Sequence, residues 1–262
     1  MSKTILIGSP NSGKSLLFNR LTGLNQKVAN FPGVTVNINS GKSLDHPTNE
    51  FLDFPGAYSL QTISGEEKIA VDAFYTALND PEISTVICVV DVTRLEKGLI
   101  FALQVINACA EQQKPLVIAA NMIDVLEQHS LNLDITGLEK ALGIPVIPVS
   151  AKSGSGLEQL QDKAINHREM PTAYSSDIIA SDDSVIHRQA QQLAMDYGPK
   201  GDLLINAQTR LDEFFLHSWF GGLSFLVIMY LLFQSIFTWA APVMDGVEGT
   251  LQLMAALPRH FC

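Results

Sequence analysis

The sequence has few cysteines and little positive charge. Cys88, Cys109 and Cys262 are too few for a disulfide framework and do not have the spacing of metal ligands. The 17 Lys and Arg stand against 27 Asp and Glu, so the formal net charge is −10. This balance argues against broad binding to nucleic acid, because phosphate neutralisation needs clustered basic side chains. With hydrophobic residues at 47% and charged ones at 17%, the chain is neither disordered nor collagen-like.

Short apolar runs alternate with helix-length segments from residue 3 to about residue 168. Such runs, rich in β-branched residues, are typical of a parallel sheet covered on both faces, so we expect an α/β, doubly wound fold. The expected strands are 4–7, 51–54, 85–90, 116–120 and 146–149, and the expected helices are 16–21, 66–78, 98–112 and 157–165. Residues 36–40, ahead of a turn at 45–47, are a candidate antiparallel edge strand.

A long uncharged stretch follows the α/β part. Residues 219–241 contain no charge over 23 positions, with Trp219 and Trp239 near the two ends. As a helix the stretch would be ~35 Å long, against a hydrocarbon core of ~30 Å. We expect an α/β domain at 1–168, a small all-α domain at 169–217, a transmembrane helix at 218–242 and a tail at 243–262. The alternative for the stretch is a buried helix of a large soluble domain. We expect no secretory signal peptide at the N-terminus, because no charged segment followed by an apolar run is found there.

The segment GSPNSGKS at 8–15 fits the pattern G-x-x-x-x-G-K-[ST] between an expected strand and an expected helix. Its glycines let backbone N–H groups face phosphates at a helix N-terminus. Lys14 is expected to reach the β- and γ-phosphates, and the Ser15 hydroxyl to ligate Mg²⁺. A plain glycine-rich turn is the alternative. The candidate phosphate-binding residues are Gly8, Asn11, Ser12, Gly13, Lys14 and Ser15.

Three later motifs follow successive expected strands. In Asp53-Phe54-Pro55-Gly56, the carboxylate can hold Mg²⁺ through water and the Gly56 N–H can donate to a γ-phosphate. In Asn121-Met122-Ile123-Asp124, the Asp124 carboxylate can accept both N1–H and N2–H₂ of guanine, while Asn121 braces the loop. Ser150-Ala151-Lys152 can present a backbone N–H to guanine O6. Together the motifs predict a GTP/GDP site.

The set GSPNSGKS, Thr35, DFPG, NMID and SAK resembles the G1 to G5 motifs of the translation-factor-related small GTPases. More narrowly, GSPNSGKSLLFNRLTG, VANFPGVTV and DFPGAYSL resemble the N-terminal G domain of FeoB-type ferrous-iron transporters. The resemblance covers residues 3 to about 155. It implies a cytosolic P-loop GTPase domain, a helical domain likened to a guanine-nucleotide dissociation inhibitor, and an attached membrane permease for ferrous iron.

The resemblance also assigns roles to single residues. Thr35 would be the switch I threonine that joins the Mg²⁺ shell, with switch I at 25–40 and switch II at 56–68. Asn11 matches the asparagine that helps to hold K⁺ in potassium-activated relatives; its alternative is a loop-stabilising role. Lys14, Thr35 and Gly56 are the expected catalytic residues. Where Ras-type enzymes have the glutamine that orients the attacking water, this chain has Ala57, so we predict slow intrinsic hydrolysis.

Three function classes follow. The first is a GTPase that regulates or drives ferrous-iron uptake at the bacterial inner membrane, with its G domain in the cytoplasm and no nucleic-acid partner. The second is a ribosome-assembly GTPase, which should carry a basic appendage, whereas this one is acidic at 177–183. The third is a membrane-anchored signalling switch. The sequence does not determine whether the protein forms a homo-oligomer. One expected membrane span is too few for a transport pore.

Overall fold

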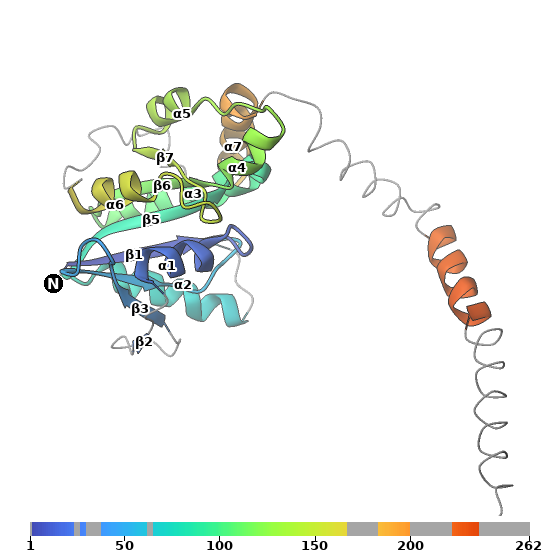
Figure 1. The fold of residues 1–262 in the computed structure, drawn as a ribbon, viewed down its shortest axis with the longest axis horizontal. Helices are drawn as coiled ribbons and strands as arrows, with labels where there is room; N and C mark the ends of the chain where they lie inside the picture. The colour runs from blue at the N-terminus through green and yellow to red at the C-terminus, as the bar shows by residue number, and fades with distance from the viewer. Residues whose placement is uncertain are drawn as a thin grey trace, which may run out of the picture. The chain divides into compact units, whose positions relative to one another are not determined.

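The computed structural model describes residues 2–23, 27–29, 38–61, 65–166, 183–199 and 222–235. Within these residues a seven-stranded sheet has the order β2-β3-β4-β1-β5-β6-β7 (Figure 1). Its strands are β1 (Ser2–Gly8), β2 (Lys27–Ala29), β3 (Ile38–Lys42), β4 (Asn49–Asp53), β5 (Ile83–Asp91), β6 (Leu116–Asn121) and β7 (Val146–Pro148). Strands β4, β1, β5, β6 and β7 are parallel, whereas β3 is antiparallel to both β2 and β4.

Helices cover both faces of this sheet. They are α1 (Lys14–Thr22), α2 (Gly65–Leu78), α3 (Leu95–Glu111), α4 (Ile123–Gln128), α5 (Ile135–Leu142), α6 (Leu157–Asn166) and α7 (Asp183–Tyr197), with a 3₁₀ turn η1 (Val92–Arg94) before α3. Helix α1 contacts β1 and β4, and α6 contacts β5 and β6. The core between these helices and the sheet contains Leu6, Phe18, Phe51, Val89, Val117 and Leu160.

The opposite face is buried as well. Residues that alternate with the first set, such as Ile5 and Cys88, have no exposed surface. Helix α3 contacts β1, β5 and β6. On this side Phe54 packs edge-to-face against Phe74 of α2, with ring centroids 6.3 Å apart. Burial on both faces explains why the parallel strands read as continuous apolar runs, and each large apolar side chain buried contributes roughly 1.5–3 kcal/mol.

Every expected strand and helix of the α/β part is present, with ends shifted by at most three residues. The position of one strand in the sheet was predicted wrongly. Strand β3 overlaps the expected 36–40 and is antiparallel, but β2 pairs outside it, so β3 is not the edge strand. The three residues of β2 carry no strand-length apolar pattern. Helices α4 and α5 were not expected, because six and eight residues are too few for a clear helical period.

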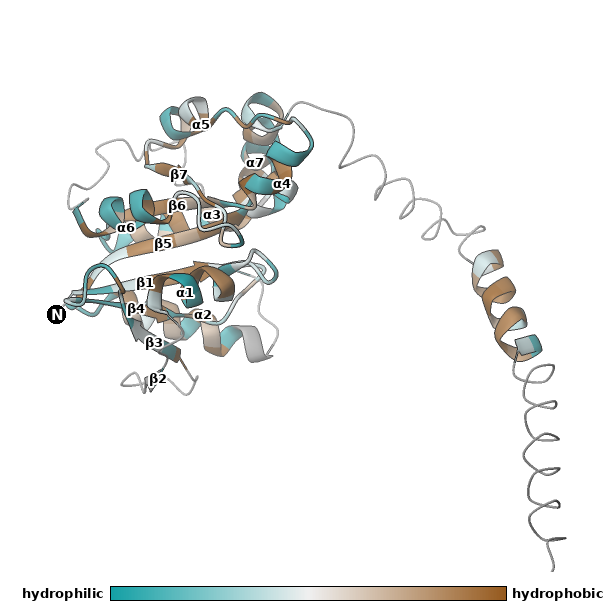
Figure 2. Cartoon of the chain, in the orientation of Figure 1, coloured by the Kyte–Doolittle hydropathy of each residue, from teal (hydrophilic) through white to brown (hydrophobic). Residues whose placement is uncertain are grey.

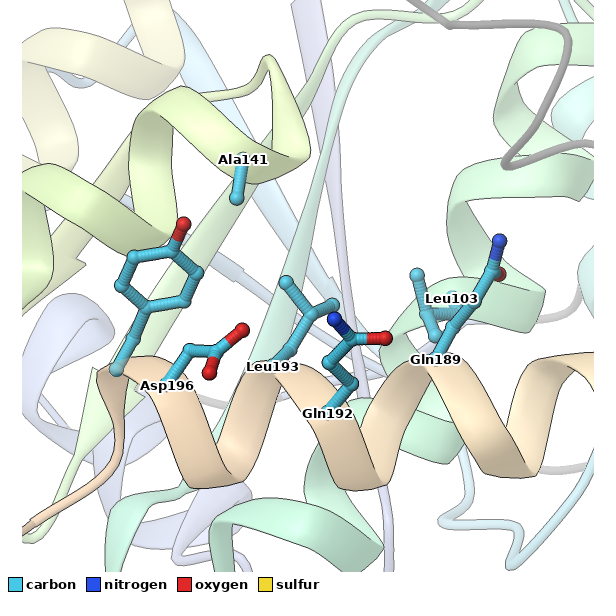
Figure 3. Close-up of a pocket in the computed structure, with 7 residues that line it drawn as sticks. Leu103, Ala141, Gln189, Gln192, Leu193 and Asp196 are labelled. Carbon is cyan, nitrogen blue, oxygen red and sulfur yellow. The ribbon is translucent and has the colours of Figure 1, made fainter.

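Helix α7 belongs to the same compact unit as the sheet, Met1–Gly201. It contacts α3 and α5. The contact leaves a cavity of about 270 Å³, lined by Leu103 of α3, Ala141 of α5 and several side chains of α7 (Figure 3). The helix ends at Tyr197, before the Gly198–Pro199 pair. The predicted domain boundary at residue 168 lies outside the described residues and stays a prediction.

The second unit is Asp202–Cys262, and its described part is a helix at 222–235. Most of its residues are hydrophobic (Figure 2), and Leu226, Leu231 and Phe233 are exposed. No helix in the part of the chain that the structure describes reaches the length and apolarity needed to cross a membrane. The remaining residues of the predicted span, 218–221 and 236–242, are outside that part, so the span at 218–242 stays a prediction.

Candidate nucleotide-binding site

The predicted motifs meet at one edge of the sheet. Each follows the carboxyl end of a parallel strand: 8–15 after β1, 53–56 at the end of β4, 121–124 after β6 and 150–152 after β7. Open α/β sheets bind ligands in the crevice outside these strand ends. A cavity of about 480 Å³ lies here and is lined by Ser9, Pro10, Asn11, Gly13, Lys14, Ser15, Leu16 and Gly56. Its size suits a small-molecule ligand.

The loop between β1 and α1 has the curled backbone that a phosphate-binding loop requires. Asn11 and Gly13 both have positive φ, at 66° and 82°. At Gly13 a Cβ atom would also lie 2.3 Å from Nδ2 of Asn121, so this position requires glycine on two grounds. Helix α1 begins at Lys14 with no acidic residue in its first turn. Its free N–H groups therefore favour an anion.

Lys14, which lines the cavity, forms a buried ion pair with Asp53. Lys14 Nζ contacts Asp53 Oδ1, and each residue is only 8% exposed. The pairing follows from the sheet, because β1 and β4 are parallel neighbours with Leu6 opposite Asp53. Two charges held out of water need a partner of opposite sign. The two side chains provide that partner for each other, Lys14 from the first residue of α1 and Asp53 from the last residue of β4.

Asn121 connects two of the loops. Its Nδ2 donates to the backbone oxygen of Ser12 at 2.8 Å, and its Oδ1 accepts from the backbone N–H of Ala151 at 3.0 Å. Asn121 is 2% exposed and lies at the end of β6, between β5 and β7. The predicted bracing contacts are therefore present. They fix the loop at 8–15 relative to the loop at 150–152.

The predicted base-binding residues lie on either side of this connection. Met122 has a positive φ of 69°, which turns the chain into α4, and Asp124 stands half-buried in the first turn of that helix. Ser150 is fully buried and its Oγ accepts from the N–H of Ser153 at 3.1 Å, while Lys152 is exposed. A carboxylate and a turn of backbone N–H groups thus lie next to each other at the ends of β6 and β7.

Two contributing residues were missed from the sequence. Arg20, in the last turn of α1, donates from Nε to the backbone oxygen of Ala151 at 3.2 Å and from Nη2 to that of Lys152 at 2.8 Å. Gln104 of α3 contacts the segment that follows Gly56. A basic residue at the end of a helix and a single polar residue on a buried helix are common, so neither pattern signals such a contact.

Other predicted residues are not placed. Thr35 and most of switch I, at 30–37, lie outside the described residues, as do 62–64 of switch II. The side chains of Glu66 and Glu67 in switch II are also outside them. Asn11 is described and exposed.

The two described cysteines are structural. Cys88 and Cys109 are both completely buried. Burial raises the pKa of the Cys88 thiol to about 12, and burial raises that of Cys109 as well. A thiol of this kind is not ionised near neutral pH and is a poor nucleophile. In the described ranges no cluster of His, Cys, Asp or Glu could hold a metal by itself.

Comparison with known proteins agrees with this geometry. The family model FeoB_N, ferrous iron transport protein B, matches residues 2–164. The chain belongs to this family. An Fe(2+) transporter FeoB of Leptospira biflexa is 41% identical over 157 residues, covering 60% of this chain and 22% of that protein. The FeoB of Salmonella typhimurium is 34% identical over 198 residues, covering 72% of this chain and 25% of that protein. The chain thus spans about a quarter or less of these FeoB relatives.

Solved structures of FeoB fragments share the fold. A GDP-bound point mutant of the S. thermophilus FeoB G-domain matches with a TM-score of 0.57 and 39% identity, over 66% of this chain and 63% of that one. The cytosolic domain of T. maritima FeoB in its GMPPNP form matches with a TM-score of 0.55 and 37% identity, over 64% of each chain. The α/β part of this FeoB-family chain is therefore a P-loop GTPase G-domain fold.

Proposed function

We propose that this chain binds GTP and hydrolyses it to GDP and phosphate. The observation that carries the proposal is the pair of hydrogen bonds made by Asn121, which ties the loop at 8–15 to the loop at 150–152. One loop suits a chain of phosphates and the other lies beside the Asp124 carboxylate, so a nucleoside triphosphate can span both. The relatives solved with GDP and GMPPNP support the same ligand class.

At the phosphate end, Lys14 is the central cation. Phosphate oxygens would compete with Asp53 for its ammonium group, and the backbone N–H groups of 8–15 would surround them. Hydroxyl and carboxylate oxygens are the donors that Mg²⁺ prefers, so Ser15, Asp53 and Thr35 suit this ion. Mg²⁺ would neutralise charge on the β- and γ-phosphates. Ser15 lines the cavity with an exposed side chain, and Asp53 contacts Lys14, which lines the same cavity, so the two described donors fit the ion.

At the base end, Asp124 would accept hydrogen bonds from N1–H and N2–H₂ of guanine. Adenine has no donors in this arrangement, so the carboxylate selects guanine. The segment Ser150-Ala151-Lys152 would present a backbone N–H to guanine O6. Arg20 supports this loop through its two backbone carbonyl bonds, and Met122 turns the chain so that Asp124 starts a helix.

Hydrolysis requires a positioned water. Ala57 is 2% exposed and has no side chain that can orient water, so backbone groups of the switches, including Gly56, would do so. K⁺ held by Asn11 would offset negative charge at the β–γ bridge. We expect slow intrinsic turnover, limited by the position of the water rather than by nucleotide affinity.

In the complete protein, this GTPase would regulate or drive ferrous-iron uptake through an attached membrane permease, with the G domain on the cytoplasmic side of the bacterial inner membrane. Membership of the FeoB family supports this role. The 23 uncharged residues at 219–241 fit a first membrane segment by length.

Substitution Asp124→Asn tests the nucleotide assignment. The amide replaces one carboxylate oxygen by an NH₂ donor, which faces the guanine N2–H₂ group with the wrong polarity but suits the carbonyl of xanthine. We expect GTP affinity to fall by about 100-fold and XTP affinity to rise, because each lost or mismatched polar contact is worth about 1–3 kcal/mol. Unchanged GTP affinity, measured by calorimetry, would remove Asp124 from the base-binding site. Asp134→Asn, at the cap of α5, is the control.

A further inference from the structure

The loop that carries Gly56 is held at its first end by β1 and the core. The backbone N–H of Phe54 donates to the oxygen of Leu6 at 3.1 Å, and the Phe54 ring packs against Phe74 of α2. Gly56 itself lies against the phosphate-binding loop: a Cβ atom there would be 3.2 Å from both the oxygen of Gly8 and the nitrogen of Pro10. The position of Gly56 therefore depends on how this loop is held at both ends.

Gln104 holds the other end. Its Oε1 accepts from the backbone N–H of Leu60 at 2.8 Å and from the Ser59 hydroxyl at 3.2 Å. Its Nε2 donates to the hydroxyl oxygen of Ser59, Oγ, at 3.0 Å. Gln104 and Leu60 are each 5% exposed. The Leu60 N–H is in no helix or strand, so a side-chain acceptor takes the place of a backbone partner.

Between these two ends the loop is in part open to solvent. Tyr58 is 64% exposed, whereas Ala57 and Leu60 on either side are buried. A cavity of about 330 Å³ beside Tyr58 and Ser59 is also lined by Asn11 and Gln104. Gln104 thus lines a cavity that is also lined by the phosphate-binding loop and by the segment after Gly56.

We propose that Gln104 is a positioning residue for GTP hydrolysis. By fixing Ser59 and Leu60, it holds the backbone N–H of Gly56 toward the γ-phosphate and keeps the neighbouring backbone where it can place the water. This inference rests on the proposed GTPase function. It predicts an effect on hydrolysis that is separate from any effect on GDP binding, because GDP has no γ-phosphate.

The decisive variant is Gln104→Leu, which keeps the approximate volume and removes all three hydrogen bonds. We expect single-turnover GTP hydrolysis to slow by about 10- to 100-fold, as misplacement by about 1 Å can cost 100-fold, with GDP affinity within about twofold of wild type. Gln104→Glu keeps the acceptor for Leu60 and Ser59, so it should retain more of the rate than Gln104→Leu and serves if the leucine variant fails to fold.

Gln161→Leu is the matched control. Gln161 is also a buried glutamine, 4% exposed, that accepts from a serine hydroxyl, Ser43, at 2.7 Å. It lies on α6, which shares a core with α1 on the face of the sheet opposite to α3. It should lose stability and keep the wild-type hydrolysis rate. Hydrolysis by Gln104→Leu within twofold of wild type would overturn the proposal, as would equal slowing in both leucine variants or a parallel loss of GDP affinity. A wild-type chain that binds GDP but cleaves no GTP would instead overturn the GTPase function, and this role with it.

Discussion

At the scale of single residues, Asn121 determines how the two halves of the site face each other. It is buried, and both of its amide atoms are used by backbone groups of other loops. In Asn121→Ala, the Ser12 oxygen and the Ala151 N–H lose their partner, at a cost of about 1–3 kcal/mol for each buried group. We expect lower stability together with a fall in GDP affinity of about tenfold or more.

Thermal unfolding and calorimetric titration of GDP would measure both effects. Asn79→Ala is the control, because Asn79 is another asparagine whose Nδ2 bonds to a backbone oxygen, that of Tyr75, but it is exposed and at the end of α2. Equal GDP affinity in the two variants would show that Asn121 does not organise the site.

Single residues also show what the sequence could and could not reveal about the site. Lys14 and Ser15 were predicted from spacing alone, because a phosphate-binding loop is encoded in eight consecutive residues. Arg20 and Gln104 were not, because their partners are more than 40 positions away. Contacts of this kind depend on which helices the fold brings beside which loops, and residue type does not specify them.

At the scale of elements, the main question is whether α7 unfolds together with the sheet or as a separate domain. It contacts α3 and α5 within the first unit, and Ile186 on this helix is fully buried. Ile186→Ala should destabilise the whole unit by about 2–5 kcal/mol and lower the temperature of a single unfolding transition. Met195→Ala on the same helix, where the side chain is 68% exposed, should change little.

Differential scanning calorimetry distinguishes the outcomes. If α7 were an independent domain, Ile186→Ala would lower a separate transition and leave that of the sheet unchanged.

The elements themselves were largely predictable. Most residues of the parallel strands are buried, and β5 is rich in β-branched residues, so the apolar runs stand out between polar turns. The edge strand β2 was missed because a strand of three residues gains its order from pairing with β3 rather than from its own sequence. For α5, the cap at Asp134, which accepts from the Gly137 N–H at 2.9 Å, is the signal that could have located it.

At the scale of the whole molecule, charge and hydropathy are distributed unequally. The chain carries a net charge of −10, yet residues 219–241 are uncharged. The acidic part is consistent with a ligand bound by a local arrangement of Lys14 and backbone N–H groups rather than by overall attraction of anions. The nucleotide site should therefore depend on the folded loops, and its affinity should be more sensitive to Lys14 than to net charge.

The central claim is that this G-domain fold selects guanine nucleotides. Calorimetric titration of the wild-type chain with GDP and, separately, with ADP, both with Mg²⁺, tests it most directly. We expect GDP to bind one site per chain and ADP to bind at least about 100-fold more weakly, because adenine cannot donate two hydrogen bonds to Asp124. Folded protein that takes up neither nucleotide, or binds both equally, would contradict it.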